Sequence, residues 1–112
     1  MKNDTAILKI GNRKIKLKNT PTPSYTPTEI DNGDGTFSSG LGMWDPIVLE
    51  VDKEHNELVR RSLYEEREFI LEEPDGKEML VNHGSVLSYD DEKITVAVKW
   101  AKLMYSEILY DV

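Results

Sequence analysis

Alternating apolar and polar residues on both sides of Gly11-Asn12 set the strongest limit on how this chain folds. A period of two residues is typical of a half-buried strand, and a two-residue turn containing Gly connects paired strands. Residues 7–18 therefore predict a β-hairpin with one apolar and one mainly basic face. The apolar face is formed by Leu8, Ile10, Ile15 and Leu17, and the opposite face carries Ile7, Lys9, Lys14, Lys16 and Lys18.

Three later segments also have strand-like patterns. Residues 47–51 alternate, and Asp52 stands where the N-cap of a helix over 53–67 belongs. Residues 69–87 alternate around a Pro-Asp-Gly turn. Past Trp100 the spacing of Trp100, Leu103 and Met104 also fits a helix, but the β-branched run before it favours a final strand from residue 94 to about 105. The side chains expected to face inward are Ile47, Leu49, Val51, Leu58, Val59, Ser62, Leu63, Glu66, Phe69, Leu71, Met79, Val81, Ile94, Val96, Val98 and Trp100.

Residues 19–46, between the hairpin and these segments, are rich in proline and glycine. A structureless segment of this length is uncommon inside a small compact domain, so it is either a disordered linker or an arm that folds against something. Tyr25, Phe37 and Trp44 favour the arm, because aromatic side chains drive burial. We expect an extended hairpin arm whose exposed tip lies near residues 32–35.

The stretch EIDNGDGTFSSGLG, residues 29–42, has the composition of a calcium-binding loop. Placing Gly35 at the sixth position of such a loop puts Ile30 first and Leu41 last, and neither side chain offers an oxygen ligand. Asn-Gly and Asp-Gly pairs favour tight turns in which φ is positive. The stretch therefore predicts a hairpin turn and no metal site.

The element order is β-β-arm-β-α-β-β-β, which is typical of a mainly β domain. We predict a single domain over residues 1–112: a β-sandwich or small β-barrel with one short covering α-helix and an extended hairpin arm at about 19–46. The chain has no cysteine, which excludes disulfides and thiolate zinc sites. Residues 1–14 lack the apolar run of a signal peptide, and no window reaches a membrane span, so we expect folding in a cytoplasm.

The formal charge of −7 is unevenly distributed along the chain. Residues 1–20 hold six basic residues and one acidic residue, whereas residues 21–112 hold eight basic and twenty acidic residues. A basic strand pair on a well-solvated acidic body is one interpretation. The other is a molecule whose oppositely charged faces dock head to tail on copies of itself. The acidic excess argues against nucleic-acid binding through a broad basic surface.

The sequence offers little that predicts catalysis. His55 and His83 lie far apart, and we expect both at the surface. The acidic run 90–92 and the glutamate pairs at 65–66 and 72–73 are typical of solvated surface groups. GLGMW lacks the lysine and the spacing of a phosphate-binding loop. We therefore expect neither enzymatic activity nor a cofactor.

Each tryptophan has a structural and a functional interpretation. Trp100 is expected in the core, because it follows the apolar face of its strand. Trp44 lies at the base of the predicted arm, where it is expected to anchor either the arm or a neighbouring molecule.

From about residue 45 onward, the chain resembles the tail tube proteins of contractile-tailed bacteriophages and their relatives in type VI secretion. DPIVLEVD resembles the strand that opens the second half of those domains, and NELVRRSLYE resembles the short helix after it. REFILEEPDGKEMLVNHGSVLSY resembles their strand–turn–strand, and DDEKITVAVKWAKLMY resembles the final strand. TPTEIDNGDGTFSSGLG matches the extended hairpin through which neighbouring subunits touch.

The resemblance implies a structural virion protein of a phage tail, made in the host bacterial cytoplasm. Six copies would form a ring, and stacked rings would form a tube with an acidic lumen through which DNA passes transiently at ejection. Other partners would be tail or baseplate proteins, with no membrane involved. The expected subunit-interface residues are Lys14, Lys16, Lys18, Tyr25, Ile30, Phe37, Leu41 and Trp44.

Two other functions remain open. One is a monomeric β-sandwich binding module that uses the arm at 19–46 as its recognition loop. The other is an enzyme, for which no set of residues supplies support. Self-assembly at high protein concentration distinguishes the tube subunit from the binding module.

Overall fold

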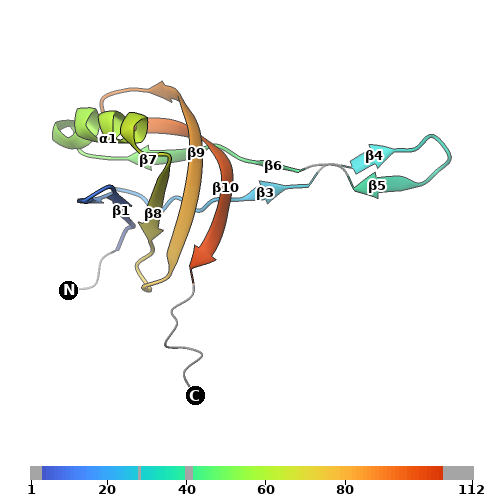
Figure 1. The fold of residues 1–112 in the computed structure, drawn as a ribbon, viewed down its shortest axis with the longest axis horizontal. Helices are drawn as coiled ribbons and strands as arrows, with labels where there is room; N and C mark the ends of the chain where they lie inside the picture. Colours follow the sequence, from blue (N-terminus) through green and yellow to red (C-terminus); the bar gives the residue numbers. More distant parts are fainter. Residues whose placement is uncertain (1–3, 28, 40–41, 105–112) are drawn as a thin grey trace, which may run out of the picture.

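The fold is taken from a computed structural model, which describes residues 4–27, 29–39 and 42–104. Its main element is a curled six-stranded antiparallel sheet in the order β2-β1-β8-β9-β10-β7 (Figure 1). The strands are β1 (Ile7–Ile10), β2 (Arg13–Lys16), β7 (Ile47–Glu50), β8 (Glu68–Glu72), β9 (Glu78–Tyr89) and β10 (Lys93–Met104). The single described helix, α1 (Lys53–Glu65), lies over one end of the sheet. The predicted fold class is confirmed: a mainly β protein with one short helix and a hairpin arm.

The β1–β2 hairpin forms as predicted. Ile10 pairs with Arg13 across the Gly11-Asn12 turn, and Gly11 has a φ of +58°. A positive φ at the first central position is typical of a type II′ turn, which suits the twist of paired strands. Leu8, Ile10 and Ile15 are buried as expected.

The chain after β2 closes the curled sheet. The Lys18 N–H donates to the Glu50 carbonyl at 2.7 Å, which ties the end of the hairpin to β7. The Asn19 side chain donates to the Val48 carbonyl at 2.8 Å and accepts the Glu50 N–H at 3.1 Å. The amide of Asn19 thus bonds to β7 as a peptide group of a neighbouring strand would.

Residues 20–24 continue along the same side of β7. Pro21 and Pro23 are buried, and the Asp45 N–H donates to the Ser24 carbonyl at 2.9 Å. The first part of the segment 19–46 therefore belongs to the body, and the projecting arm begins beyond it.

The core fills the space enclosed by the sheet and α1. It consists of Ala6, Leu8, Ile10, Ile15, Leu17, Ile47, Leu49, Val51, Val59, Leu63, Phe69, Leu71, Val81, Ile94, Val96 and Val98. The helix contributes Val59 and Leu63, and Leu58 packs partly against the core. Glu66, which was expected to be near-inward, is exposed because the helix ends at residue 65 and the backbone of Glu66 is extended.

Asp52 holds the predicted N-cap position, but its side chain makes no capping hydrogen bond. Its carboxylate instead lies 3.6 Å from Lys18 Nζ. At the other end of α1, Arg13 Nη1 donates to Ser62 Oγ at 3.2 Å. Asp52, just before the helix, and Ser62, in its last turn, are thus tied to Lys18 and to Arg13 of the β1–β2 hairpin.

The prediction that Trp100 lies in the core is wrong. The pairing of β10 with β9 shifts register between Val98 and Trp100, which marks a β-bulge. An extra residue in one strand reverses the faces of the residues beyond it. Val98 is buried, Ala101 packs against the core, and Trp100 is left 37% exposed on the other side.

The arm is built from two short antiparallel pairs. At its base, β3 (Tyr25–Thr26) pairs with β6 (Met43–Trp44), and beyond them β4 (Glu29–Asp31) pairs with β5 (Phe37–Ser39). The β4–β5 hairpin projects away from the body (Figure 1). Gly33 and Gly35 have φ values of +82° and +90°, so the predicted hairpin turn is confirmed.

Candidate functional site

The base of the arm is held by aromatic and polar contacts. The Tyr25 and Trp44 rings meet edge to face, with centroids 5.3 Å apart, and Trp44 packs against the core. The Asp45 carboxylate accepts hydrogen bonds from Ser24 Oγ at 2.8 Å and from Thr26 Oγ1 at 3.1 Å. Trp44 therefore anchors the arm to its own body.

Gly42 lies against the Tyr25 ring and donates its N–H to the Tyr25 hydroxyl at 2.8 Å. A Cβ at Gly42 would lie 2.1 Å from the ring, so a larger residue would displace Tyr25. Despite these contacts, Tyr25 is 50% exposed and Met43 is 70% exposed. The arm base thus presents apolar surface to solvent.

The carboxylates at the arm tip stabilise the turn. Asp31 Oδ1 accepts the Gly33 N–H at 2.8 Å, and Asp34 Oδ1 accepts the Thr36 N–H at 3.0 Å. Hydrogen bonds from the Thr36 hydroxyl and N–H lower the pKa of Asp34. The carboxylates that give this stretch the composition of a calcium-binding loop thus accept hydrogen bonds from backbone N–H groups of the turn.

The arm is acidic throughout. Between residues 24 and 45 it carries Glu29, Asp31, Asp34 and Asp45, and no lysine or arginine. Two surfaces on the body are basic, and their charge is therefore opposite to that of the arm.

The first basic surface is the outer face of the β1–β2 hairpin. Lys18 is engaged within the chain, 3.6 Å from both Asp52 and Glu92. Lys9 donates to Glu78 at 3.0 Å, and this hydrogen bond raises the pKa of Lys9. Lys14 and Lys16 are exposed and make no ion pair within the described ranges.

The second basic surface, at the end of β10, was not identified from the sequence. Lys99 and Lys102 form no ion pair with any residue that the structure describes. Lys102 Nζ lies 5.7 Å from the centroid of the Trp100 ring, and Leu103 and Met104 are also exposed. In the sequence this surface corresponds to KWAKLM, residues 99–104, where lysines lie among large apolar residues. The sequence does not show that Trp100 is exposed, because the face on which it lies depends on the β-bulge before it.

Two open grooves also lie on the body, one of them beside the β1–β2 hairpin. One, of about 500 Å³, is lined by charges of both signs, including Lys9, Arg13 and Glu66. The other, of about 440 Å³, lies between α1 and the end of β9, where the Arg60 guanidinium stands 4.0 Å from the centroid of the Tyr89 ring. Among the residues that line the two grooves there is no histidine.

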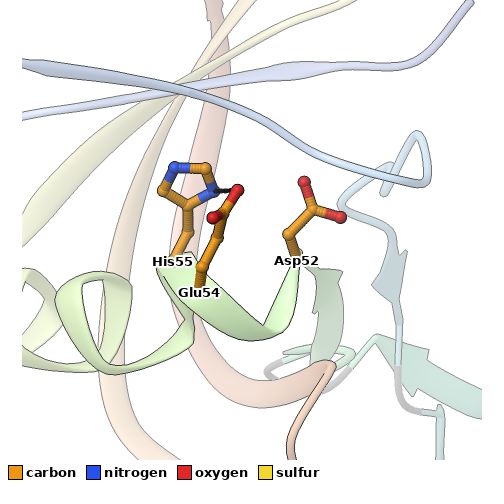
Figure 2. Close-up of side chains that lie close together, drawn as sticks. All are labelled: Asp52, Glu54 and His55. Atoms are coloured by element: carbon orange, nitrogen blue, oxygen red, sulfur yellow. Dashed lines mark ion pairs between the residues drawn. The ribbon is translucent and has the colours of Figure 1, made fainter.

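Asp52, Glu54 and His55 are the one group of metal-ligand types that comes together within the described residues (Figure 2). His55 Nδ1 lies 4.0 Å from Glu54 Oε1, and Asp52 already faces Lys18. The group sits at the start of α1, where the helix dipole disfavours a cation. This arrangement favours a surface cluster over a metal site.

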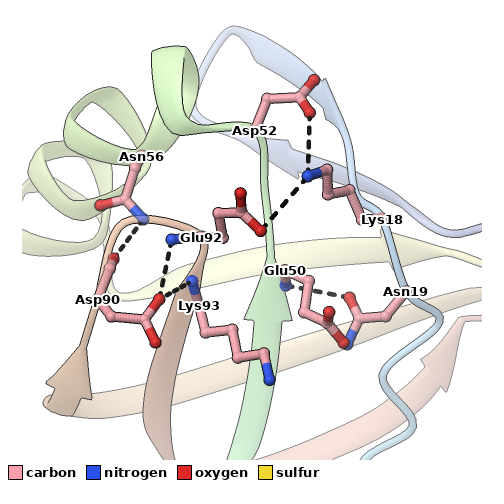
Figure 3. Close-up of polar contacts among 8 residues, drawn as sticks. All are labelled: Lys18, Asn19, Glu50, Asp52, Asn56, Asp90, Glu92 and Lys93. Carbon is pink, nitrogen blue, oxygen red and sulfur yellow. Dashed lines mark hydrogen bonds and ion pairs between the residues drawn. The ribbon is translucent and has the colours of Figure 1, made fainter.

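The acidic run 90–92 closes the β9–β10 turn (Figure 3). The Asp90 carboxylate accepts the N–H groups of Glu92 and Lys93 at 2.9 and 2.8 Å, and these bonds lower the pKa of Asp90. The buried Asn56 side chain donates to the Asp90 carbonyl at 2.9 Å, which fastens α1 to the turn.

The prediction that His83 lies at the surface is wrong. The ring is 6% exposed and stacks on Phe69, with centroids 5.5 Å apart. Nδ1 lies 2.7 Å from the Gly84 carbonyl oxygen, and Nε2 lies 2.6 Å from that of Glu66. His83 thus joins the end of α1 to β9 and is a structural residue.

The expected interface residues fall into distinct groups. Lys14, Lys16 and Tyr25 are exposed, Lys18 is bound within the chain, and Trp44 is half-buried. In the β4–β5 hairpin, Ile30 pairs with Ser38 and Phe37 pairs with Asp31. The side chains of Ile30 and Phe37 and the whole of Leu41 lie outside the part that the structure describes.

In the part of the chain that the structure describes, no helix has the length and apolar character needed to cross a membrane. Comparisons with family models, with curated proteins and with solved structures gave no significant match to this chain.

Proposed function

We propose that this protein is a structural subunit that assembles with copies of itself, and that the arm joins one copy to the next. The observation that carries the proposal is the β4–β5 hairpin, which projects from the body on a base with exposed apolar side chains (Figure 1). An isolated two-stranded hairpin is at best marginally stable in water. A second molecule that packs on the hairpin supplies the missing contacts.

The resemblance to phage tail tube proteins favours a ring-forming subunit of a phage tail, without catalytic activity. The acidic excess of residues 21–112 suits a channel that DNA crosses without adhering, because basic linings bind phosphate strongly. The setting in a virion, the six-fold ring and the tail or baseplate partners rest on this resemblance alone.

A monomeric binding module is the competing function. The groove lined by Arg60, Tyr64 and Tyr89 supports it, because arginine and tyrosine are enriched at binding hot spots. In that case the arm is a recognition loop for a different protein, and the chain remains monomeric at all concentrations.

The test compares the wild-type chain with a variant in which Asn-Gly replaces residues 27–42. Thr26 and Met43 are paired partners, so a two-residue turn can close the shortened hairpin. Sedimentation velocity and negative-stain microscopy at rising concentration and low salt should show rings or polymers for wild type only. A wild-type chain that remains monomeric under these conditions contradicts self-assembly and favours the binding module.

A further inference from the structure

We propose that the open edge of β10, residues 97–104, receives the β4–β5 hairpin of a second copy by strand addition. The inference rests on the proposed self-assembly and names the surface that accepts the arm. A further strand could add to either outer strand of the sheet, β7 or β2, or to the part of β10 that β7 leaves uncovered.

The first two places, along β7 and β2, are less open. Along β7, residues 19–26 cover the outer side, and the prolines at 21 and 23 have no N–H to offer a further strand. Along β2, the Arg13 side chain bonds to Ser62 of α1, and Lys18, just after the strand, pairs with Asp52, just before the helix. A strand added along β7 would have to displace residues 19–26, and a strand added along β2 would meet these contacts with α1.

The edge of β10 is open. β7 pairs with β10 only from Lys93 to Val96, whereas β9 pairs with β10 as far as Met104. β6 belongs to a separate sheet, and β10 curves away from it toward its C-terminal end (Figure 1). No other described strand pairs with residues 97–104 on that side, although β6 lies beside part of this stretch, so the backbone groups beyond β6 can bind an incoming strand.

The side chains of this edge match the arm in charge and polarity. Residues 97–104 contain Lys99 and Lys102 and no acidic residue, while the arm contains four acidic residues and no basic one. Trp100, Leu103 and Met104 are between 37% and 42% exposed, and an added strand would cover them. The strand β2 is also basic, but the exposed side chains of 13–16 include no large apolar group.

The occupant is a second copy because each molecule's own hairpin points away from its body (Figure 1). The donating hairpin and the accepting edge are different surfaces, so the contact is head to tail. Such contacts close into rings or continue as filaments, whereas a symmetric contact stops at a dimer.

The first test reverses charge on matched surfaces. Lys99→Glu with Lys102→Glu and Lys14→Glu with Lys16→Glu change the net charge equally, and all four lysines are exposed. We expect the β10 pair to raise the protein concentration needed for assembly by about tenfold or more, and the β2 pair by about twofold or less. Circular dichroism and urea midpoints establish that both variants fold.

The second test uses the absence of cysteine in the chain. A Ser38→Cys chain is mixed with a size-tagged Lys102→Cys chain, or with a tagged Lys14→Cys chain as control, and oxidised. Disulfide heterodimers should form with Lys102→Cys well above the Lys14→Cys background, because the bond requires Cα atoms within about 7 Å.

The outcomes separate the two proposals. Wild-type chains that never assemble overturn self-assembly and this inference together. Wild-type assembly that survives reversal of Lys99 and Lys102, or cross-linking that favours Lys14→Cys, overturns the β10 edge alone and leaves self-assembly standing.

Discussion

The two histidines show how single residues of one type acquire different roles from their surroundings. His55 is partly exposed on the first turn of α1, as expected from its polar neighbours. His83 follows the same inward-facing row as Val81 and is buried beside Phe69. Its burial is tolerated because two backbone carbonyls lie within hydrogen-bond distance of the ring nitrogens.

His83→Ala should destabilise the protein by about 2–4 kcal/mol, because it leaves a cavity in the core and removes the ring N–H that can donate to a backbone carbonyl. His55→Ala is the matched control and should change the unfolding free energy by less than about 0.5 kcal/mol. Urea denaturation followed by circular dichroism measures both. Equal effects for the two variants would contradict the structural role of His83.

At the scale of elements, the closure of the sheet depends on residues that have no strand pattern. The hairpin, β7, the β8–β9 pair and α1 were all predicted from periodicity and turn residues. The segment 19–24 was assigned to the arm, because its prolines suggested irregular chain. In the structure these prolines lie beside β7 at the edge of the sheet, where the missing N–H of a proline breaks no hydrogen bond between strands.

Asn19→Ala should cost about 1–2 kcal/mol, since it removes both hydrogen bonds between the side chain and β7. Asn19→Asp should not restore the loss, because a carboxylate accepts the Glu50 N–H but repels the Val48 carbonyl oxygen. Hydrogen exchange of the Glu50 amide should accelerate in Asn19→Ala, which leaves that N–H without its acceptor. Full protection of that amide in Asn19→Ala would argue against the closing role.

At the scale of the whole molecule, the body and the arm are stabilised by different interactions. The body has a continuous core, while the β4–β5 hairpin projects away from the body (Figure 1). The body should therefore fold without the arm tip.

Replacing residues 27–42 by Asn-Gly should leave the unfolding free energy of the monomer within about 1 kcal/mol of wild type. The urea m-value should fall only slightly, because it scales with the surface exposed on unfolding, and the arm tip buries little. Equilibrium unfolding at a concentration below assembly measures both quantities. A large loss of stability would mean that the tip packs on the body.

The sequence by itself determined the strands, the helix, their order and the tight turns, because those depend on local periodicity and on residues such as Gly11 and Gly35 that adopt positive φ. Only the tertiary structure decided which sheet edges are covered, which way Trp100 faces, and that His83 is buried. These features depend on a one-residue shift in the pairing of β10 with β9 and on contacts between segments far apart in the chain. Neither can be predicted from the local pattern of residues.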